Sequence, residues 1–298
     1  MLLKLGDKNV EVTEVQKLLS MLGYDLIIDG EYNSKTVRSI NSFQKKNRLT
    51  IDGEVGKKTL QALKAAQKNT AKEIKGLSTP IDYAKEIKVI VSKQLASSQY
   101  IKQNFKKSQI FVHFTLGGQH SENVINNWDS GEPQVSSAYV IDGETAHIHE
   151  TYNPNFWSYH LGIKGTNGKL DKISIGIEMC SWGPLTEKDG KFFTYTNKEI
   201  EVDKVYTLDE PFRGFLHYYA YSEEQLNSLE KLMCWLIEKY EISVQNFFDK
   251  NWFEYNEDII KKITPGIYSH SSVRHDKYDS YPDKRLIELL NRISKKYN

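Results

Sequence analysis

The chain of 298 residues contains little cysteine and has no long apolar run. Its two cysteines, Cys180 and Cys234, do not make a disulfide framework, and we expect both to be reduced thiols in the core. No apolar stretch is long enough for a membrane-spanning helix. The formal net charge is only +1, so the composition predicts no nucleic acid and no membrane as a partner.

The first residues, MLLKLGDKNVEV, lack the apolar core and the small-residue cleavage site of a secretory signal. We therefore expect synthesis in the cytoplasm without a signal peptide. The length favours more than one domain. Nothing in the sequence fixes the oligomeric state, and a monomer is favoured.

A repeat occupies the N-terminal part of the chain. Residues 27–44, IIDGEYNSKTVRSINSFQ, resemble residues 50–67, TIDGEVGKKTLQALKAAQ. Each Asp-Gly pair predicts a turn, because glycine can adopt a positive φ, and each turn precedes apolar residues at helical spacing. A further helix is predicted in EVTEVQKLLSMLGY, which begins at Glu11. Residues 1–66 therefore predict a small all-α domain of three helices.

A polar segment follows this domain. Residues 67–80, QKNTAKEIKGLSTP, end in glycine, serine, threonine and proline, which predicts a linker. The second domain then covers residues 81–298. Its first part, residues 81–105, has apolar residues at helical spacing, and we expect a helix there that packs on the second domain.

The second domain mixes strand and helix patterns. QIFVHFTLGG (109–118) predicts a buried strand, and in DKISIGIEMCSWG (171–183) isoleucines alternate with Ser174, Gly176 and Glu178. VSSAYVIDGETAHIHE (135–150) predicts a hairpin that turns at Asp142-Gly143. Amphipathic helices follow Ser222 and Pro282. We predict an α/β domain with a central mixed β-sheet flanked by helices.

The loop SHSSVRHDKYD, near the C-terminus, gathers an imidazole, an ammonium and a carboxylate that its backbone does not require. His113 lies in the predicted strand 109–118. Together with His270 and Asp279 of the loop it forms a three-ligand set for zinc, which leaves a fourth position for water. Glu178 is then a candidate general base, and Lys277 is a candidate for stabilising an oxyanion.

The spacing of residues in the sequence does not by itself decide between alternative metal ligands. Asp276 and Asp283 lie close to Asp279 in the sequence, and His120 and His275 are two further histidines.

Both domains resemble known families. Residues 1–66 look like the peptidoglycan-binding domain often attached to cell-wall hydrolases, through Asp29-Gly30, Phe43-Gln44 and Asp52-Gly53. Most of residues 109–283 resemble the zinc amidases that include the N-acetylmuramoyl-L-alanine amidases of bacteriophages and bacteria, and the animal peptidoglycan-recognition proteins. The motifs IFVHFT, VSSAYVID, WSYHLG, SIGIE and H…K.D occur in the family's order.

The resemblance implies a role for each candidate residue. The zinc ligands would be His113, His270 and Asp279, Glu178 would be the base, and Lys277 the electrophilic helper. The substrate contacts that it implies are His160, Tyr139 and Trp157. Three features depart from the family. Ser137-Ala138 stand where its second block usually has an aromatic residue or histidine, and the motif KxDPGP is replaced by KYDSYPD. Residues 184–260 exceed the compact family core, with a role that the sequence leaves open.

The function expected from this resemblance is hydrolysis of bacterial peptidoglycan between N-acetylmuramic acid and L-alanine by a zinc-activated water. Without a signal peptide, the enzyme would act on the cell wall after phage-mediated lysis, as an endolysin does. Two alternatives remain: a recognition protein that binds peptidoglycan without cutting it, and a zinc peptidase that acts on another amide of the wall.

Overall fold

The computed structural model describes residues 2–22, 24, 26, 29–76, 89–90 and 94–298. Contacts divide the chain into two compact units, Met1–Ile81 and Asp82–Asn298, which are described separately. Among the described residues, no helix has the length and apolarity needed to cross a membrane.

The first unit contains the three predicted helices, α1 (Val10–Met21), α2 (Ser34–Lys46) and α3 (Lys57–Gly76). They enclose a small core that includes Val15, Leu19, Ile40, Phe43 and Leu63. The helix α3 continues to Gly76, and thus into the segment 67–80 predicted as a linker.

The sequence repeat is also a structural repeat. The buried side chain of Gln16 accepts a hydrogen bond from the Gly30 N–H (2.8 Å) and donates one to Asp29 (2.8 Å). The buried side chain of Gln44 does the same at the second turn, with Gly53 (3.0 Å) and Asp52 (2.7 Å). Both glycines have the predicted positive φ, 76° and 69°. These glutamines tie each turn to the helix before it.

The second unit is built on a six-stranded mixed sheet, as predicted. Its order is β1-β4-β3-β5-β2-β11, in which β3, β5, β2 and β11 are parallel and β4 runs antiparallel to β3. The strands are β1 (Val89–Ile90), β2 (Gln109–Phe114), β3 (Tyr139–Ile141), β4 (Ile148–Glu150), β5 (Ser174–Met179) and β11 (Gly266–Ser269). The predicted hairpin is β3–β4, but its loop runs from Asp142 to His147 instead of turning at Asp142-Gly143.

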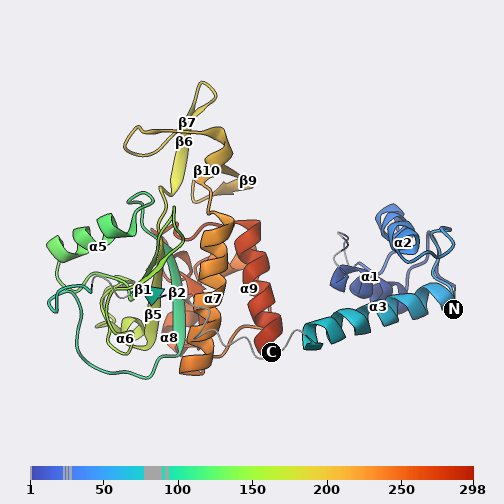
Figure 1. Cartoon of the computed structure of the whole chain (residues 1–298), viewed down its shortest axis with the longest axis horizontal. Helices are drawn as coiled ribbons and strands as arrows, with labels where there is room; N and C mark the ends of the chain where they lie inside the picture. The colour runs from blue at the N-terminus through green and yellow to red at the C-terminus, as the bar shows by residue number, and fades with distance from the viewer. Residues whose placement is uncertain (1, 23, 25, 27–28, 77–88, 91–93) are drawn as a thin grey trace. The chain divides into compact units, whose positions relative to one another are not determined.

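Helices cover both faces of this sheet. The long helices α7 (Glu223–Tyr240) and α9 (Lys284–Tyr297) lie side by side along it (Figure 1) and enclose the main core. A second cluster joins Phe111 and Leu161 to Leu170 of α6 (Lys169–Ile173) and Ile259 of α8 (Glu257–Lys262). The remaining helical segments are α5 (Ser121–Ser130), η1 (Val202–Lys204), η2 (Lys250–Phe253) and η3 (His270–Ser272). The side chains of Cys180 and Cys234 are buried in the main core, as predicted.

Ser222 caps α7 as predicted, since its side chain accepts from the Gln225 N–H. The side chain of Gln225 does not return to the cap. It donates to the carbonyls of Ile141 and Cys180 and so joins α7 to the sheet.

The prediction of a helix over residues 81–105 is wrong for the part of this segment that the structure describes. Residues 81–88 and 91–93 lie outside the described residues. Val89–Ile90 form β1, and residues 94–105 contain no helix. The Leu95 N–H donates to the Thr151 carbonyl, and Ile101 exchanges backbone hydrogen bonds with Trp157. Partners distant in sequence therefore replace the hydrogen bonds that a helix would supply locally.

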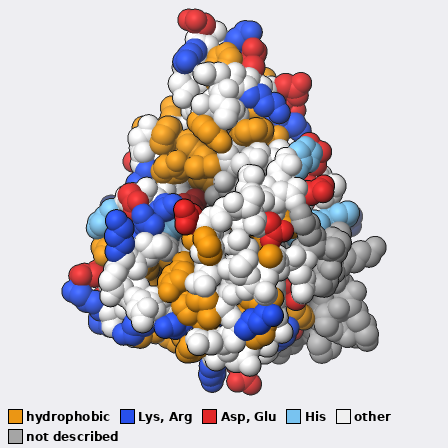
Figure 2. All heavy atoms as spheres, turned by 90° about the vertical axis from the view of Figure 1, so that its left-hand side faces the viewer, with side chains coloured by type: hydrophobic (Ala, Val, Ile, Leu, Met, Phe, Trp, Pro, Cys, Tyr) orange, Lys and Arg blue, Asp and Glu red, His pale blue; other side chains and the backbone are white. Residues whose placement is uncertain are grey.

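A second sheet is inserted between β5 and α7, and we call residues 184–219 the inserted sheet. Its five antiparallel strands have the order β8-β7-β6-β10-β9 and extend from the end of the central sheet (Figure 1). They are β6 (Pro184–Lys188), β7 (Lys191–Phe193), β8 (Glu199–Ile200), β9 (Val205–Phe212) and β10 (Phe215–Tyr219). Figure 2 shows charged side chains over its tip and hydrophobic side chains gathered below.

Candidate metal and catalytic site

The candidate site lies at the carboxyl ends of three neighbouring parallel strands. His113 is the penultimate residue of β2 and pairs in register with Glu178 of β5. His270 follows directly after β11, the other neighbour of β2. The carboxyl ends of parallel strands commonly form ligand sites, because successive loops meet there.

The alternation in β5 separates the core from the site. Ile175 and Ile177 enter the main core, whereas Ser174, Gly176 and Glu178 alternate with them and face the other side. A Cβ at Gly176 would lie 2.9 Å from the Ser137 hydroxyl and 3.0 Å from the ring of His160. Glycine is needed here because it leaves room for the imidazole.

Three buried groups converge at the end of β2. The Nδ1 atoms of His113 and His270 are 3.0 Å apart, and each lies 3.0–3.1 Å from Oδ2 of Asp279. Within the part of the chain that the structure describes, this is the one group of histidine and carboxylate side chains close enough to hold a metal ion. The structure thus brings together the three ligands predicted from the sequence.

The contacts of the two Nε2 atoms, which face away from Asp279, indicate that this group is suited to a cation. Nε2 of His270 faces the Leu161 carbonyl at 2.9 Å and donates to it, so Nδ1 carries no proton when the ring is neutral. Nε2 of His113 lies 3.0 Å from Nδ1 of His160, whose Nε2 is 2.7 Å from the Ser174 hydroxyl. When His113 donates to His160, two bare nitrogens and a carboxylate oxygen point at one another. Three converging electron pairs fit a metal such as zinc.

Electrostatics favours the metal-binding protonation states of His113 and Asp279. Burial, together with His270, lowers the pKa of His113 to about 4, so the ring is neutral at pH 7. Burial alone would raise the pKa of Asp279, but the two imidazoles beside it, His270 foremost, hold that pKa well below its usual value. Neutral imidazoles and an ionised carboxylate are the forms that bind metals.

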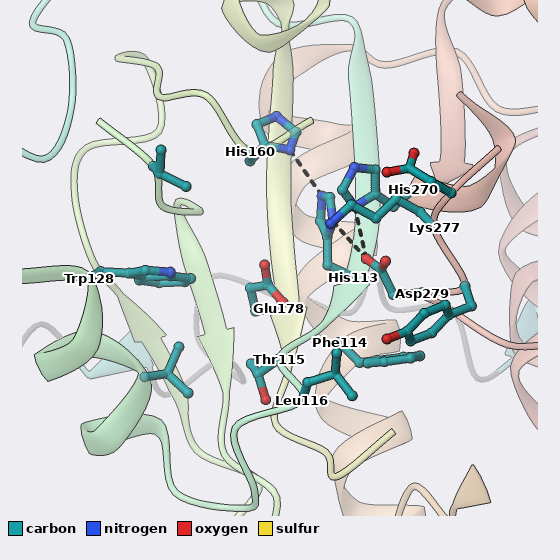
Figure 3. Close-up of a pocket in the computed structure, with 14 residues that line it drawn as sticks. His113, Phe114, Thr115, Leu116, Trp128, His160, Glu178, His270, Lys277 and Asp279 are labelled. Atoms are coloured by element: carbon teal, nitrogen blue, oxygen red, sulfur yellow. Dashed lines mark hydrogen bonds and ion pairs between the residues drawn. The ribbon is translucent and has the colours of Figure 1, made fainter. Parts of the chain in front are cut away.

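A cavity of about 290 Å³ opens over this group. In Figure 3, Glu178 lies between the ligand group and Trp128, and Lys277 points toward the ligands. Oε1 of Glu178 accepts from Ser137 (3.3 Å), while the enclosed Oε2 has no hydrogen-bond partner. Burial, followed by the charge of Asp279, raises the pKa of Glu178 to about 8. A carboxylate with one free oxygen and a pKa near neutrality is suited to proton transfer.

The rival ligands are engaged elsewhere. Asp276 lies at the cavity but is paired with Arg274, and Asp283 caps α9 and binds Arg285. His120 is exposed beside Glu144, and the ring of His275 stacks on Tyr255.

The three implied substrate contacts lie in different places. His160 lines the cavity but is only 9% exposed, and both of its ring nitrogens have partners. Tyr139 is fully buried, donates to Glu150 and packs against Trp235, and Trp157 is buried against Tyr159. Neither Tyr139 nor Trp157 lines the cavity.

Sequence reasoning missed the apolar wall of the cavity. Val124 and Trp128 of α5, together with Leu116 and Val135, face the charged side. The signal available was the i, i+4 spacing of Val124 and Trp128, which marks one face of a helix.

Two family models match the chain. One, described as a peptidoglycan binding domain, matches residues 8–63, and the other, described as N-acetylmuramoyl-L-alanine amidase, matches residues 104–282, more than half of the chain. No curated protein matches the chain significantly.

Solved structures with similar parts include a peptidoglycan-binding protein from Clostridioides difficile, 38% identical over 21% of this chain and 40% of that one, with a TM-score of 0.21. A Burkholderia AP3 phage endolysin is 36% identical over 21% and 24%, with a TM-score of 0.21. The amidase AmiD from E. coli is 16% identical over 48% and 47%, with a TM-score of 0.31. The matched segments span less than half of each of these proteins.

Proposed function

The chain belongs to the N-acetylmuramoyl-L-alanine amidase family, and on this premise we propose that its second unit hydrolyses the amide between N-acetylmuramic acid and L-alanine in bacterial peptidoglycan. The observation that carries this function is the cavity in which His113, His270 and Asp279 converge beside the unpaired oxygen of Glu178.

The residues divide the chemistry between them. Zinc, when bound by the two histidines and Asp279, supplies a Lewis acid that lowers the pKa of an attacking water. Glu178 accepts the proton of that water and can return it to the leaving amine, since its pKa is near neutrality. Lys277 places positive charge at the cavity where the carbonyl oxygen becomes negative. Ser174 and His160 keep the ring of His113 oriented.

Product identity tests this assignment. Purified stem-peptide-bearing muropeptide is incubated with the zinc-loaded protein, and the new amino termini are labelled and identified by mass spectrometry. We expect a free L-alanine amino terminus. Any other new amino terminus would contradict the amidase assignment and indicate a peptidase that acts on another amide of the wall. Binding without cleavage would favour a recognition protein.

The first unit is proposed to hold the enzyme on its polymer, as its match to peptidoglycan binding domains supports. Because α3 continues to Gly76, the deletion that tests this should remove residues 1–76. We expect activity on whole walls to fall at least about tenfold through loss of effective concentration. Activity on soluble muropeptide should stay within about twofold. Equal losses on both substrates would contradict this division of labour.

The site of action follows from this substrate. We propose that the protein acts on the cell wall as an endolysin, reaching it when phage-mediated lysis opens the cell. Lysis of intact cells by protein added from outside, and its loss in the active-site variants described below, would test this role.

A further inference from the structure

The loop that carries the catalytic groups lacks rigid residues of its own. We call residues 270–281, HSSVRHDKYDSY, the ligand loop; it contains His270, Lys277 and Asp279 but neither glycine nor proline. Its two ends are tied to Ser269, the last residue of β11: the Ser269 hydroxyl donates to the Asp279 carbonyl and accepts from the Ser280 N–H, and the Ser272 hydroxyl donates to the Ser269 carbonyl. These bonds hold the two ends of the loop, so the position of Lys277 between them depends on other contacts.

Arg213 of the inserted sheet reaches this loop. It occupies the tight turn between β9 and β10, with φ 51°, and Gly214 follows with φ 87°. Its guanidinium donates to the His275 carbonyl (2.6 Å) and, at 3.5 Å, to the Ser271 carbonyl. These carbonyls belong to the residue after His270 and to the residue two before Lys277. One planar cation thus bridges the segment between a ligand and the catalytic lysine.

The inserted sheet also packs against the residues that flank Asp279. Phe215 contacts Tyr278, with ring centroids 5.7 Å apart. On the other side, the ring of Tyr281 stacks on Tyr218 at 4.3 Å, and its hydroxyl donates to the Tyr219 carbonyl at 3.1 Å. Tyr281 is fully buried. Aromatic contacts therefore fix the loop one residue before Asp279 and two residues after it.

We propose that the inserted sheet is a brace for the ligand loop and that Arg213 is a positioning residue for Lys277 and the metal ligands. This inference rests on the proposed function, and it gives residues 184–219 a role in it. Arg213 acts through backbone carbonyls, so its loss should loosen the ligands and the lysine without removing any group that contacts substrate.

Arg213→Ala and Arg213→Lys test this role. The matched control is Lys250→Ala, which removes the exposed partner of Glu210 on β9 of the same sheet. Three quantities are measured on the full chain: the zinc Kd, by competition with a chromophoric chelator; kcat and KM on soluble muropeptide; and the melting temperature. For Arg213→Ala we expect the Kd to rise and kcat to fall by about tenfold each, with KM within about twofold. Arg213→Lys should recover only part of both losses, because its ammonium keeps the positive charge but lacks the planar fork of the guanidinium.

Other results are equally decisive. If Arg213→Ala lowers only the melting temperature, and keeps the zinc Kd and kcat within about twofold of the wild type at a temperature where it is folded, the inference is wrong. The same holds if Lys250→Ala loses as much as Arg213→Ala. A wild-type protein that neither binds zinc nor cleaves would overturn the proposed function itself, together with this inference.

Discussion

Replacing His270 by alanine is expected to abolish stoichiometric zinc binding and to lower turnover of muropeptide by about a thousandfold or more. The ring supplies one of three converging donors, and its Nε2 is fixed by the Leu161 carbonyl. Two remaining donors cannot complete the coordination of a catalytic zinc. Metal content after dialysis and the initial rate on muropeptide are the two measurements.

His275→Ala is the matched control, since it removes a histidine from the same loop whose ring stacks on Tyr255 away from the ligand group. It should retain about one zinc per chain and near wild-type turnover. If His275→Ala lost the metal and His270→Ala kept it, the assignment of ligands would be wrong.

The second large effect is expected for Glu178→Gln. The amide keeps the shape of the side chain but cannot accept the proton of the attacking water, so kcat should fall by about a hundredfold to a thousandfold. Zinc content should be unchanged, because Glu178 is not part of the ligand group. Turnover and metal content are measured together, with the exposed Glu132→Gln as control. Unchanged turnover would show that Glu178 is not the general base.

The same variant has a stability signature in metal-free protein. Folding raises the pKa of Glu178 to about 8, so the folded state disfavours the carboxylate form. At pH 4 the group is largely protonated whether folded or unfolded, and the penalty grows as the pH rises toward 8. Glu178→Gln should therefore melt a few degrees above the wild type at pH 8. The gain should shrink toward zero at pH 4, and a gain of equal size at both would point to packing instead of charge.

Local sequence determined much of the fold and singled out the candidate reactive groups. The Asp-Gly turns and the helical spacing predicted the three helices of the first unit, because turns and amphipathic helices depend on residues close in the chain. The alternation in β5 likewise predicted a strand with Glu178 near its end. His113, His270 and Asp279 were identified by residue type and motif order.

The tertiary structure decided which candidates meet and which do not. Asp279 is distinguished from Asp276 and Asp283 only by what each contacts. Tyr139 and Trp157 fit the motifs but are buried away from the cavity. Arg213 lies 62 residues before the carbonyl that it binds. Such contacts depend on how strands distant in sequence pair and on where the inserted sheet packs, and local periodicity carries no information about either.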